Sequence, residues 1–523
     1  MKNEKLLQEL QQKQESFLTT CRKRVKKQEK WTASDWIEDA TQKIKNINPE
    51  PVDFHDYDEN GKIQEPKSIY YQRIVKNVLA FIQEATESEF CLTSIPERLG
   101  KLFGCLVFWN GRQWFRLDGD QIAGIKVKKL ITTAATRLGI DDETSEASFF
   151  IDGLLKELRL LLSPIGKPNN EFGWLNFTNG TLRINTKTAN TTFLPHDKTN
   201  YLTHMLPYDY DPKAIAPLFD EFLLRVLPRE TTRAALMEFL GSCFLPGRGS
   251  GKIMLALGTP SGDNGKSTLI RILEQVLGRE NVTNYSLTEL SRKETVRYNI
   301  TGKLLNWGDE LGTNFDAENI KKMAGGEPVI VRQMYGQPSE SDRYARLAGN
   351  VNELPSTNEI TESFFKRLLV IPFLEMIPKE KQDPGLATRI CETERCGILN
   401  QILRGTYRLI QNNYQIETPE TTTARQAYRA QLNPVVAWVE TVTLDEIFKE
   451  EVKDEYGQTV GKKIPVNIMK ATELYHAFLR WAADNDPGNA KMSQTKFGRL
   501  TQMLQGVIRD RSNQTGLVIY KKI

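Results

Sequence analysis

Apolar residues in the middle of the chain change from a continuous run to a helical spacing. The run Ile253–Leu257 is unbroken, a Gly-rich stretch follows it, and Leu269, Ile270, Ile272 and Leu273 recur on one helical face. A short unbroken apolar run is typical of a buried strand, and spacings of three and four residues are typical of an amphipathic helix. The pattern therefore predicts a strand, a loop and a helix over residues 253–273.

The same patterning divides the chain into four regions, 1–70, 71–245, 246–410 and 411–523. The first is predicted to be a basic helix with a polar, Pro-containing linker. The second is expected to be mostly helical (149–162, 208–228 and 231–245), with strand and turn units at 106–117 and 176–197. The third alternates strand and helix. The fourth opens with a polar, Thr-rich linker at 411–433 and ends in a mixed segment.

Composition narrows the protein class without naming a function. The 523 residues are 39% hydrophobic and 26% charged, which is ordinary for a protein with a packed core. The six cysteines show neither a CxxC pair nor zinc spacing with histidine, so a reducing, cytoplasmic location fits best. No apolar run is long enough to cross a membrane. A net charge of +4 is too small to argue for nucleic acid, except through local clusters such as Arg22–Lys30.

The Gly-rich stretch carries phosphate-binding chemistry. A loop whose backbone N–H groups converge at a helix N-terminus binds anions, and Lys266 there would neutralise the β- and γ-phosphates of ATP. The hydroxyl of Ser267 would bind Mg²⁺. The strict phosphate-loop pattern wants Gly at position 260, where this chain has Pro260. A turn that only caps the helix is the alternative. The expected ATP contacts are Gly262, Asp263, Asn264, Gly265, Lys266, Ser267 and Thr268.

An acidic pair supplies the second half of such a site. Leu304 and Leu305 begin a predicted strand, and Asp309 and Glu310 end it. Asp309 would hold Mg²⁺ through water, and Glu310 would orient and deprotonate the attacking water. A solvated pair of carboxylates is the alternative interpretation.

Basic residues follow in a predicted hairpin. Residues 320–355 suggest a helix end, a Gly-Gly stop, a strand, a turn and a return strand that carries Arg343 and Arg346. Together with Arg332 these side chains would suit a DNA phosphate backbone, or would simply form a solvated face.

Two polar residues complete the set of candidate catalytic groups. Asn352 follows an apolar strand, where its amide would orient water and sense the γ-phosphate. Arg367 stands at the start of another strand, from which a guanidinium would reach a γ-phosphate. For Arg367 the alternative is a structural arginine that pairs with a local carboxylate.

Taken in order, these motifs resemble the superfamily 3 helicases, specifically the phage, plasmid and poxvirus-type primase-helicases. The stretches GDNGKST, GDE, IKKMAGGE, NVNELP and FFKRLLVIPF carry the resemblance, and upstream and C-terminal segments extend it from about residue 100 to the end. It implies an α/β fold: an AAA+ P-loop ATPase with a helical lead-in region and a C-terminal winged-helix-like domain. It also implies a homo-oligomeric ring, usually a hexamer, that moves along single-stranded or forked DNA with 3′-to-5′ polarity.

The resemblance also assigns roles. Lys266, Ser267 and Thr268 match the phosphate-binding motif, with ATP and Mg²⁺ as the implied ligands. Asp309 and Glu310 match the acidic motif, and Asn352 matches the sensor. Arg367 matches the arginine that reaches into a neighbour's site, and Lys321 matches a lysine of the DNA-facing motif. Two residues depart from the expected patterns. Pro260 stands where the strict phosphate-loop pattern has Gly, and Glu327 stands where the family more often has Asp.

Several functions remain open at this stage. Asp56 and Asp58 could form a metal-binding pair of a priming enzyme, but no strand-rich region surrounds them, so we interpret them as linker and expect any primase or replication initiator to be a separate chain. The leading hypothesis is a DNA helicase of a mobile element. The rival is an ATP-regulated DNA-binding initiator or loader, and a role in host defence or packaging is a third.

Overall fold

The structure is a computed structural model, and it describes most of the chain beyond residue 32. The described residues are 33–50, 52, 59–60, 62, 67–86, 89–93, 106–109, 111–116, 121–141, 150–153, 164–165, 172–202, 204–259, 262–308, 316–332, 334, 337–351, 362–453, 459–501, 504, 506–511 and 517–522. The basic cluster Arg22–Lys30 and the Asp56 and Asp58 pair lie outside them.

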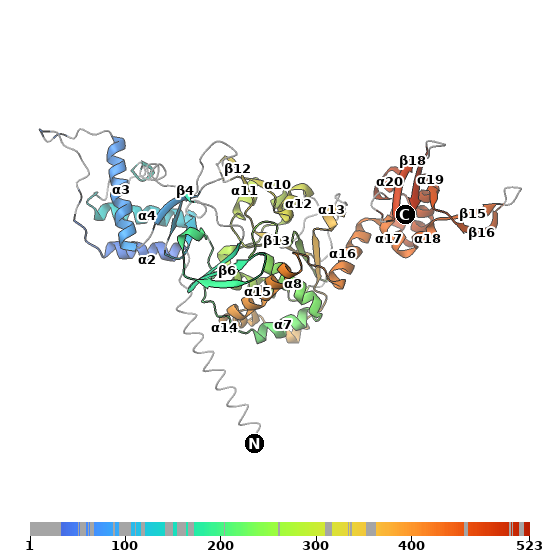
Figure 1. The fold of residues 1–523 in the computed structure, drawn as a ribbon, viewed down its shortest axis with the longest axis horizontal. Coiled ribbons are helices and arrows are strands. Elements are labelled where there is room, and N and C mark those ends of the chain that lie inside the picture. The colour runs from blue at the N-terminus through green and yellow to red at the C-terminus, as the bar shows by residue number, and fades with distance from the viewer. Residues whose placement is uncertain are drawn as a thin grey trace, which may run out of the picture.

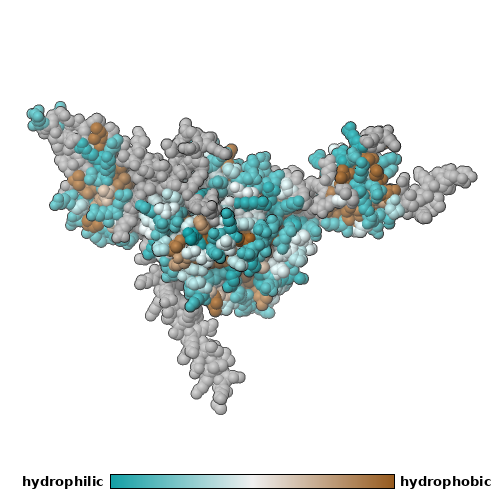
Figure 2. All heavy atoms as spheres, viewed as in Figure 1, coloured by the Kyte–Doolittle hydropathy of each residue, from teal (hydrophilic) through white to brown (hydrophobic). Residues whose placement is uncertain are grey.

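Three bodies follow one another along the chain (Figure 1). A helical N-terminal lobe precedes a central body, and helix α16 (Pro419–Leu432) leads from the central body to a C-terminal lobe. The two lobes each bury a separate hydrophobic cluster. In Figure 2 the visible face of the central body is mostly hydrophilic, with scattered hydrophobic residues. Among the described helices, none combines the length and apolar character that crossing a membrane requires.

The N-terminal lobe packs three helices around aliphatic side chains. These helices are α2 (Ala33–Lys45), α3 (Lys67–Thr86) and α4 (Gln121–Arg137). A small sheet adjoins in the strand order β3-β2-β1-β4, made of β1 (Glu89–Thr93), β2 (Leu106–Trp109), β3 (Trp114–Arg116) and β4 (Pro164–Ile165). The hairpin predicted at 106–117 is confirmed, since β2 and β3 pair antiparallel.

A second small sheet connects the lobe to the central body. It contains β5 (Phe172–Phe177), β6 (Gly180–Asn185) and β7 (Thr191–Leu194), so the strand and turn unit predicted at 176–197 is confirmed apart from its first strand, which begins four residues earlier. Leu175 and Leu182 are buried in the central core. On the other side, the Nδ2 of Asn176 donates to the carbonyl of Arg112 at 2.7 Å.

The central body is organised around a five-stranded parallel sheet in the order β14-β8-β13-β10-β9. The strands are β8 (Ile253–Leu257), β9 (Val282–Thr283), β10 (Leu305–Gly308), β13 (Arg346–Val351) and β14 (Leu368–Pro372). Strand β8 lies between β13 and β14 and is buried over nearly its whole length. Parallel strands buried on both faces give unbroken apolar runs, which explains why β8 could be predicted.

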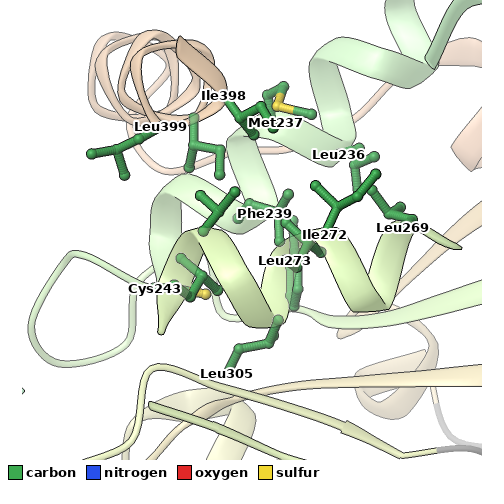
Figure 3. Close-up of a cluster of buried hydrophobic side chains, with 14 of the residues drawn as sticks. Leu236, Met237, Phe239, Cys243, Leu269, Ile272, Leu273, Leu305, Ile398 and Leu399 are labelled. Carbon is green, nitrogen blue, oxygen red and sulfur yellow. The ribbon is translucent and has the colours of Figure 1, made fainter. Parts of the chain in front are cut away.

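Helices cover both faces of this sheet, because alternate residues of each strand point to opposite sides. Met254 and Ala256 face one cluster, and Ile253 and Leu255 face the other. Figure 3 shows the first cluster, with Leu236 and Phe239 of α8 (Glu230–Ser242) packed against side chains of α9 (Lys266–Leu277) and α15 (Arg395–Gln411). The second cluster includes α10 (Leu287–Arg292), α12 (Ala317–Gly325) and α16.

The first cluster extends across the predicted region boundary between residues 245 and 246. It joins side chains of β5 and β6, α7 (Pro217–Val226) and α8 to side chains of the sheet, α9, α14 (Leu386–Thr393) and α15. Helix α7 is held at its start by Glu394, whose carboxylate oxygens accept from the backbone N–H groups of Leu218 and Phe219 at 3.0 and 2.9 Å. The segments before residue 246 are therefore part of the core that supports the sheet.

The predicted hairpin in 320–355 forms with a different return strand. Strand β11 (Val329–Arg332) pairs antiparallel with β12 (Pro338–Ser341), and β12 ends before Arg343. Arg346 instead begins β13 of the central sheet. The expectation that the return strand carries both arginines is wrong, because the chain leaves the hairpin at Ser341 and re-enters the core.

The polar segment predicted to be a linker at 411–433 is largely helical. Residues Pro419–Leu432 form α16, and Tyr428 is buried against Phe365 with ring centroids 5.7 Å apart. The remaining small helices of the central body are α11 (Glu294–Asn299) and α13 (Glu362–Phe365). Tyr428 is the one aromatic residue of α16 that packs against the core. A single apolar position gives no helical periodicity, so the sequence pattern did not predict this helix.

The C-terminal lobe has the order helix, helix, strand, helix, helix, strand, strand, with one added hairpin before the first of these strands. Its elements are α17 (Pro434–Thr441), α18 (Leu444–Ile447), β15 (Lys449–Lys453), β16 (Thr459–Pro465), β17 (Ile468–Lys470), α19 (Ala471–Asn485), α20 (Gln494–Thr501), β18 (Val507–Arg511) and β19 (Val518–Lys522). Strands β17, β19 and β18 form one sheet in that order.

Candidate nucleotide-binding site

The Gly-rich loop leaves the sheet at the carboxyl end of β8. Backbone bonds to both neighbouring strands hold the start of the loop: the N–H of Gly258 donates to the carbonyl of Val351 at 2.7 Å, and the N–H of Phe373 donates to the carbonyl of Leu257 at 2.6 Å. The loop enters α9 at Lys266. The carboxyl edge of a parallel sheet, where strands turn into helices, is the usual place for a ligand in such folds.

Left-handed residues shape the loop. Gly262, Asp263 and Gly265 have φ of 74°, 52° and 80°. Turns that contain left-handed residues let successive N–H groups face one side, which creates a concave anion-binding surface. Gly265 is required twice over, because a Cβ atom at that φ is strained and would lie 2.5 Å from Cγ1 of Val226. The contact with Val226 of helix α7 therefore fixes the position of the loop backbone at Gly265.

Two buried polar side chains stand at the end of the loop. Lys266 is 7% exposed, and burial lowers the pKa of its ammonium group. Asn264 is 3% exposed, and its Nδ2 has no hydrogen-bond partner among the described residues. Burial of an amide donor without an acceptor costs free energy, and so does the desolvation of a cation. A bound anion would remove both costs, so these residues fit a phosphate ligand.

Helix α9 begins without a side chain that caps it. No side-chain hydrogen bond reaches its first N–H groups within the described residues. Ser267 is exposed in the first turn and Thr268 is half-buried. The N–H groups at the start of a helix and the positive end of its dipole favour an anion there. Because Ser267 is exposed, its hydroxyl is accessible to a metal ion bound beside the loop.

The acidic pair and the sensor amide lie outside the described residues. Asp309 and Glu310 follow the last residue of β10, and Asn352 follows the last residue of β13. Gly308 pairs with Gly349, and Val351 pairs with Leu257, so both strands end at the same edge as β8. The side-chain positions of Asp309, Glu310 and Asn352 stay predictions.

An unpredicted contact ties the two strands that lead to these residues. The Nε1 of Trp307, a fully buried residue of β10, donates to the Oδ1 of Asn350 in β13 at 3.0 Å. The bond fixes the relative height of the strand ends that precede Asp309 and Asn352. Pairing between residues that are 43 positions apart leaves no local signal in the sequence.

Arg367 lies at the opposite edge of the sheet from the loop. It precedes β14, whose first residue Leu368 pairs with Ile253, the first residue of β8. At about 3.3 Å per residue, the length of β8 puts on the order of 13 Å between the two edges. The Nη1 of Arg367 donates to the carbonyl of Ser363 at 2.8 Å, and no carboxylate pairs with Arg367 in the described part of the chain. The guanidinium is thus far from the loop of its own subunit.

The predicted DNA contacts fall into different environments. Lys321 is half-buried on α12. The side chain of Arg332 is 47% exposed at the end of β11 and pairs with Glu294 at 3.4 Å. Arg343 is half-buried after β12, and burial lowers the pKa of its guanidinium. The hairpin, the loop after it and α12 therefore present these three cations separately rather than on one strand face.

Arg346 is part of the fold, which corrects its assignment as a DNA contact. Its Nε donates to the carbonyl of Ser242 at 3.0 Å, Nη1 to that of Gly247 at 2.7 Å and Nη2 to that of Leu245 at 2.6 Å. Burial lowers the pKa of the guanidinium. The side chain closes the C-terminal end of α8 onto β13, so none of these donors is available to a phosphate without breaking the fold.

We expect Arg346→Leu to destabilise the central body by about 2–4 kcal/mol, because hydrogen bonds from a charged donor are lost and buried carbonyls remain without partners. The urea midpoint of unfolding measures the change. Arg332→Leu is the control: it removes an exposed arginine with one ion pair, worth about 0–1 kcal/mol. Equal midpoints for the two variants would contradict the structural role of Arg346.

Sequence reasoning missed one residue that positions the loop and one property of a residue that it did name. Glu394 orders the start of α7, and α7 supports Gly265 through Val226. The N–H groups that Glu394 accepts from lie 175 and 176 positions away, so no local pattern predicts the contact. Asn264 was expected to contact ATP only as a member of the loop. Its buried, unsatisfied amide is visible only in three dimensions.

Two family models match parts of the chain. One, described as a family of unknown function (DUF5906), covers residues 258–367, and the other, described as D5 N terminal like, covers residues 98–228. The first spans the loop, the acidic pair and Arg367, and the second spans much of the region before the sheet. Each matches well under half of the chain.

Curated relatives include viral proteins. The chain is 27% identical over 174 residues to "Putative helicase L207/L206" of Acanthamoeba polyphaga mimivirus, covering 31% of this chain and 17% of that protein. It is 23% identical over 320 residues to "Putative helicase 121R" of Invertebrate iridescent virus 3, covering 58% of this chain and 30% of that protein. The chain spans less than a third of the length of either relative.

Among solved structures, the chain is similar to "The A form apo structure of NrS-1 C terminal region-CTR". That match has a TM-score of 0.44 and 10% identity and covers 85% of this chain and 98% of the other. A second structure, "The apo structure of NrS-1 C terminal region (305-718)", has a TM-score of 0.39 with the same coverage. At such scores the likeness supports no argument about fold or function.

Proposed function

We propose that this protein is an ATP-dependent, ring-forming DNA helicase that translocates on single-stranded DNA during replication of a mobile element. One observation carries the proposal: a left-handed, Gly-rich loop brings a buried lysine and an unsatisfied buried amide, Lys266 and Asn264, to the start of an uncapped helix. The names of the viral relatives support the helicase part, and the parallel sheet fits a P-loop ATPase core.

In this proposal the loop binds the triphosphate of ATP. The N–H groups of residues 262–268 and the ammonium of Lys266 bind its anionic oxygens. Ser267 and Asp309 would hold Mg²⁺, which when bound neutralises charge on the β- and γ-phosphates. Glu310 accepts a proton from the attacking water, and Asn352 orients that water. The shared carboxyl edge of β8, β10 and β13 supports this grouping.

The ring part of the proposal rests on Arg367. The guanidinium of Arg367 lies at the edge of the sheet opposite the Gly-rich loop, so it cannot contact ATP bound to the loop of its own subunit. The Gly-rich loop of a neighbouring copy could lie at that edge. Arg367 then completes the neighbour's site. For DNA we propose Lys321, Arg332 and Arg343 as phosphate contacts: they lie on α12, at the end of β11 and just after β12, which follow one another along the chain.

Lys266→Ala is the direct test of the proposed site. Loss of a charged donor to phosphate is worth about 1.5–3 kcal/mol, so we expect affinity for ATP to fall about 10- to 150-fold. Titration of a fluorescent ATP analogue measures the change. The matched control is Arg271→Ala, which removes a positive charge from the exposed side of the same helix. If both variants bind the analogue as the wild type does, the loop is not a nucleotide site.

A second candidate function is favoured by the C-terminal lobe. Its helix α20 exposes Thr495, Lys496 and Arg499, and strand β18 beside it exposes Arg509 and Arg511. A helix followed by a two-stranded wing, with cations on both, suits duplex DNA. This arrangement fits an ATP-regulated, DNA-binding initiator or loader with little unwinding of its own. ATP-driven unwinding of a forked duplex supports the helicase, whereas tight duplex binding without unwinding supports the initiator.

A further inference from the structure

A cavity of about 210 Å³ lies at the amino edge of the central sheet, away from the phosphate loop. The small sheet that contains β5 forms one side, and the loop after α8 and the segments that lead into β10 and β13 form the other. In Figure 1, β6 of the small sheet lies between the N-terminal lobe and the central body. None of the residues proposed for ATP contributes to this cavity.

Aromatic side chains form one wall. Phe172 and Trp174 are two positions apart on β5, so they point to the same face, and their ring centroids are 5.9 Å apart. The guanidinium of Arg183 lies 4.8 Å from the centroid of the Phe172 ring. Tyr201 adds a third aromatic ring to the lining and is held in the left-handed region at φ 51°. Both Phe172 and Trp174 are half-buried, so part of each ring faces the cavity or solvent.

The opposite wall is cationic. Lys303, Arg343 and Arg346 line it, and Asp342 is the one acidic residue among the described residues of the lining. Arg346 donates to three backbone carbonyls, and Lys303 and Arg343 are the other two cations of this wall. The Nζ of Lys303 donates to the carbonyl of Glu280, which is an interaction that a phosphate could replace. Burial lowers the pKa of Arg343, and a nearby anion would offset that desolvation.

A neutral histidine adds hydrogen-bonding capacity. The Nε2 of His204 lies 3.1 Å from the carbonyl of Trp174, which can only accept, so Nε2 carries the proton. Burial lowers the pKa of His204, and the ring is therefore neutral near pH 7 with Nδ1 as an acceptor. The cavity thus combines flat aromatic surface, cations and a neutral polar group.

We propose that this cavity binds one unstacked base of single-stranded DNA, which stacks on Trp174 while its phosphate lies toward Lys303 and Arg343. The inference rests on the proposed function and adds a second contact region for the strand. The volume lies below the roughly 300–1,000 Å³ of sites that enclose a whole small molecule, so it suits one ring system of a longer ligand. Aromatic stacking accepts any base, and cations beside it hold the backbone.

Photo-crosslinking tests the proposal at residue level. The full chain is irradiated with a single-stranded oligonucleotide that contains 5-iodo-2′-deoxyuridine, and the crosslinked peptides are identified by mass spectrometry. We expect crosslinks at Phe172, Trp174 or Tyr201. Crosslinks confined to other segments, such as the hairpin β11–β12, would overturn the proposal.

Substitution of Trp174 gives an independent measurement. Loss of one stacked base costs about 1–3 kcal/mol, so Trp174→Ala should weaken binding of an oligothymidylate about 5- to 150-fold, and Trp174→Phe should restore most of the affinity. Tyr407→Ala is the matched control, because Tyr407 is 53% exposed on α15 and does not line the cavity. Unchanged affinity in Trp174→Ala, or an equal loss in Trp174→Phe, would refute the stacking role.

The same preparations separate this inference from the proposed function. Binding of the fluorescent ATP analogue is measured on the wild type and on each Trp174 variant. If the analogue binds and the DNA effects are absent, the cavity proposal alone fails. If the wild type binds neither the analogue nor single-stranded DNA, both proposals fail. A Trp174→Ala protein that binds the analogue normally is folded around the sheet, so its loss of DNA binding is local.

Discussion

Arg367→Ala protein is expected to hydrolyse ATP about 10³- to 10⁵-fold more slowly than the wild type, the usual effect of a guanidinium on phosphoryl transfer. The reason is geometric: Arg367 directly precedes β14 at the edge of the sheet opposite the Gly-rich loop, so a γ-phosphate within its reach would belong to another subunit. Mixing Arg367→Ala with Lys266→Ala protein should restore partial activity. Some interfaces of a mixed ring then join an intact loop to an intact arginine.

Steady-state ATPase across mixing ratios measures the effect, with a maximum expected near one to one. Lys366→Ala is the control, because it removes the exposed neighbouring cation and should leave hydrolysis nearly unchanged. Near-normal activity of Arg367→Ala alone would mean that the arginine is structural. An inactive variant that mixing never rescues, under conditions of subunit exchange, would exclude action between subunits.

Glu310→Gln is expected to keep binding of ATP and DNA while lowering turnover about 10²- to 10⁴-fold, which is the typical contribution of a general base. Glutamine retains the size and polarity of the side chain but cannot accept the proton of the attacking water. Pre-steady-state measurement of phosphate release separates this step from binding. The prediction follows from the position of Glu310 two residues after the end of β10.

The control for Glu310 is Glu318→Gln, which neutralises an exposed carboxylate of α12 that pairs with Lys322 at 2.7 Å. It should hydrolyse ATP at close to the wild-type rate. A Glu310→Gln protein that turns over normally would remove Glu310 from the mechanism. A variant that no longer binds ATP would instead point to a role in holding the ligand.

The Gly-rich loop and the strands beside it could be predicted as structural elements because their signals are local. An unbroken apolar run predicts β8, observed at Ile253–Leu257, and the spacing after Lys266 predicts α9, observed to Leu277. Strand β10 begins at Leu305, one residue later than expected. Each of these elements is specified by residues within a few positions of one another, so one sequence is sufficient.

The contacts that hold the site in place could not be predicted in the same way. Arg346 was assigned to a hairpin face, yet its donors meet carbonyls of residues 242, 245 and 247, about a hundred positions earlier. Gly265 fits under Val226 of another helix. Such contacts depend on which distant elements pack together. Asp309, Glu310 and Asn352 stay predictions, although the strands before them end where the hypothesis requires.

The hydrophobic cluster that crosses residue 246 has a consequence for modularity. The stretch 258–367 that one family model matches contains α9, β9, β10 and β13 but not α7, α8, β8, β14 or α15, which cover or complete the same sheet. Separated from them, that stretch would expose side chains such as Leu269 and Leu273 to water. Exchange of an intact central body between related proteins would therefore have to transfer about residues 172–432 as one block, because a boundary inside this block would cut through the shared buried surface.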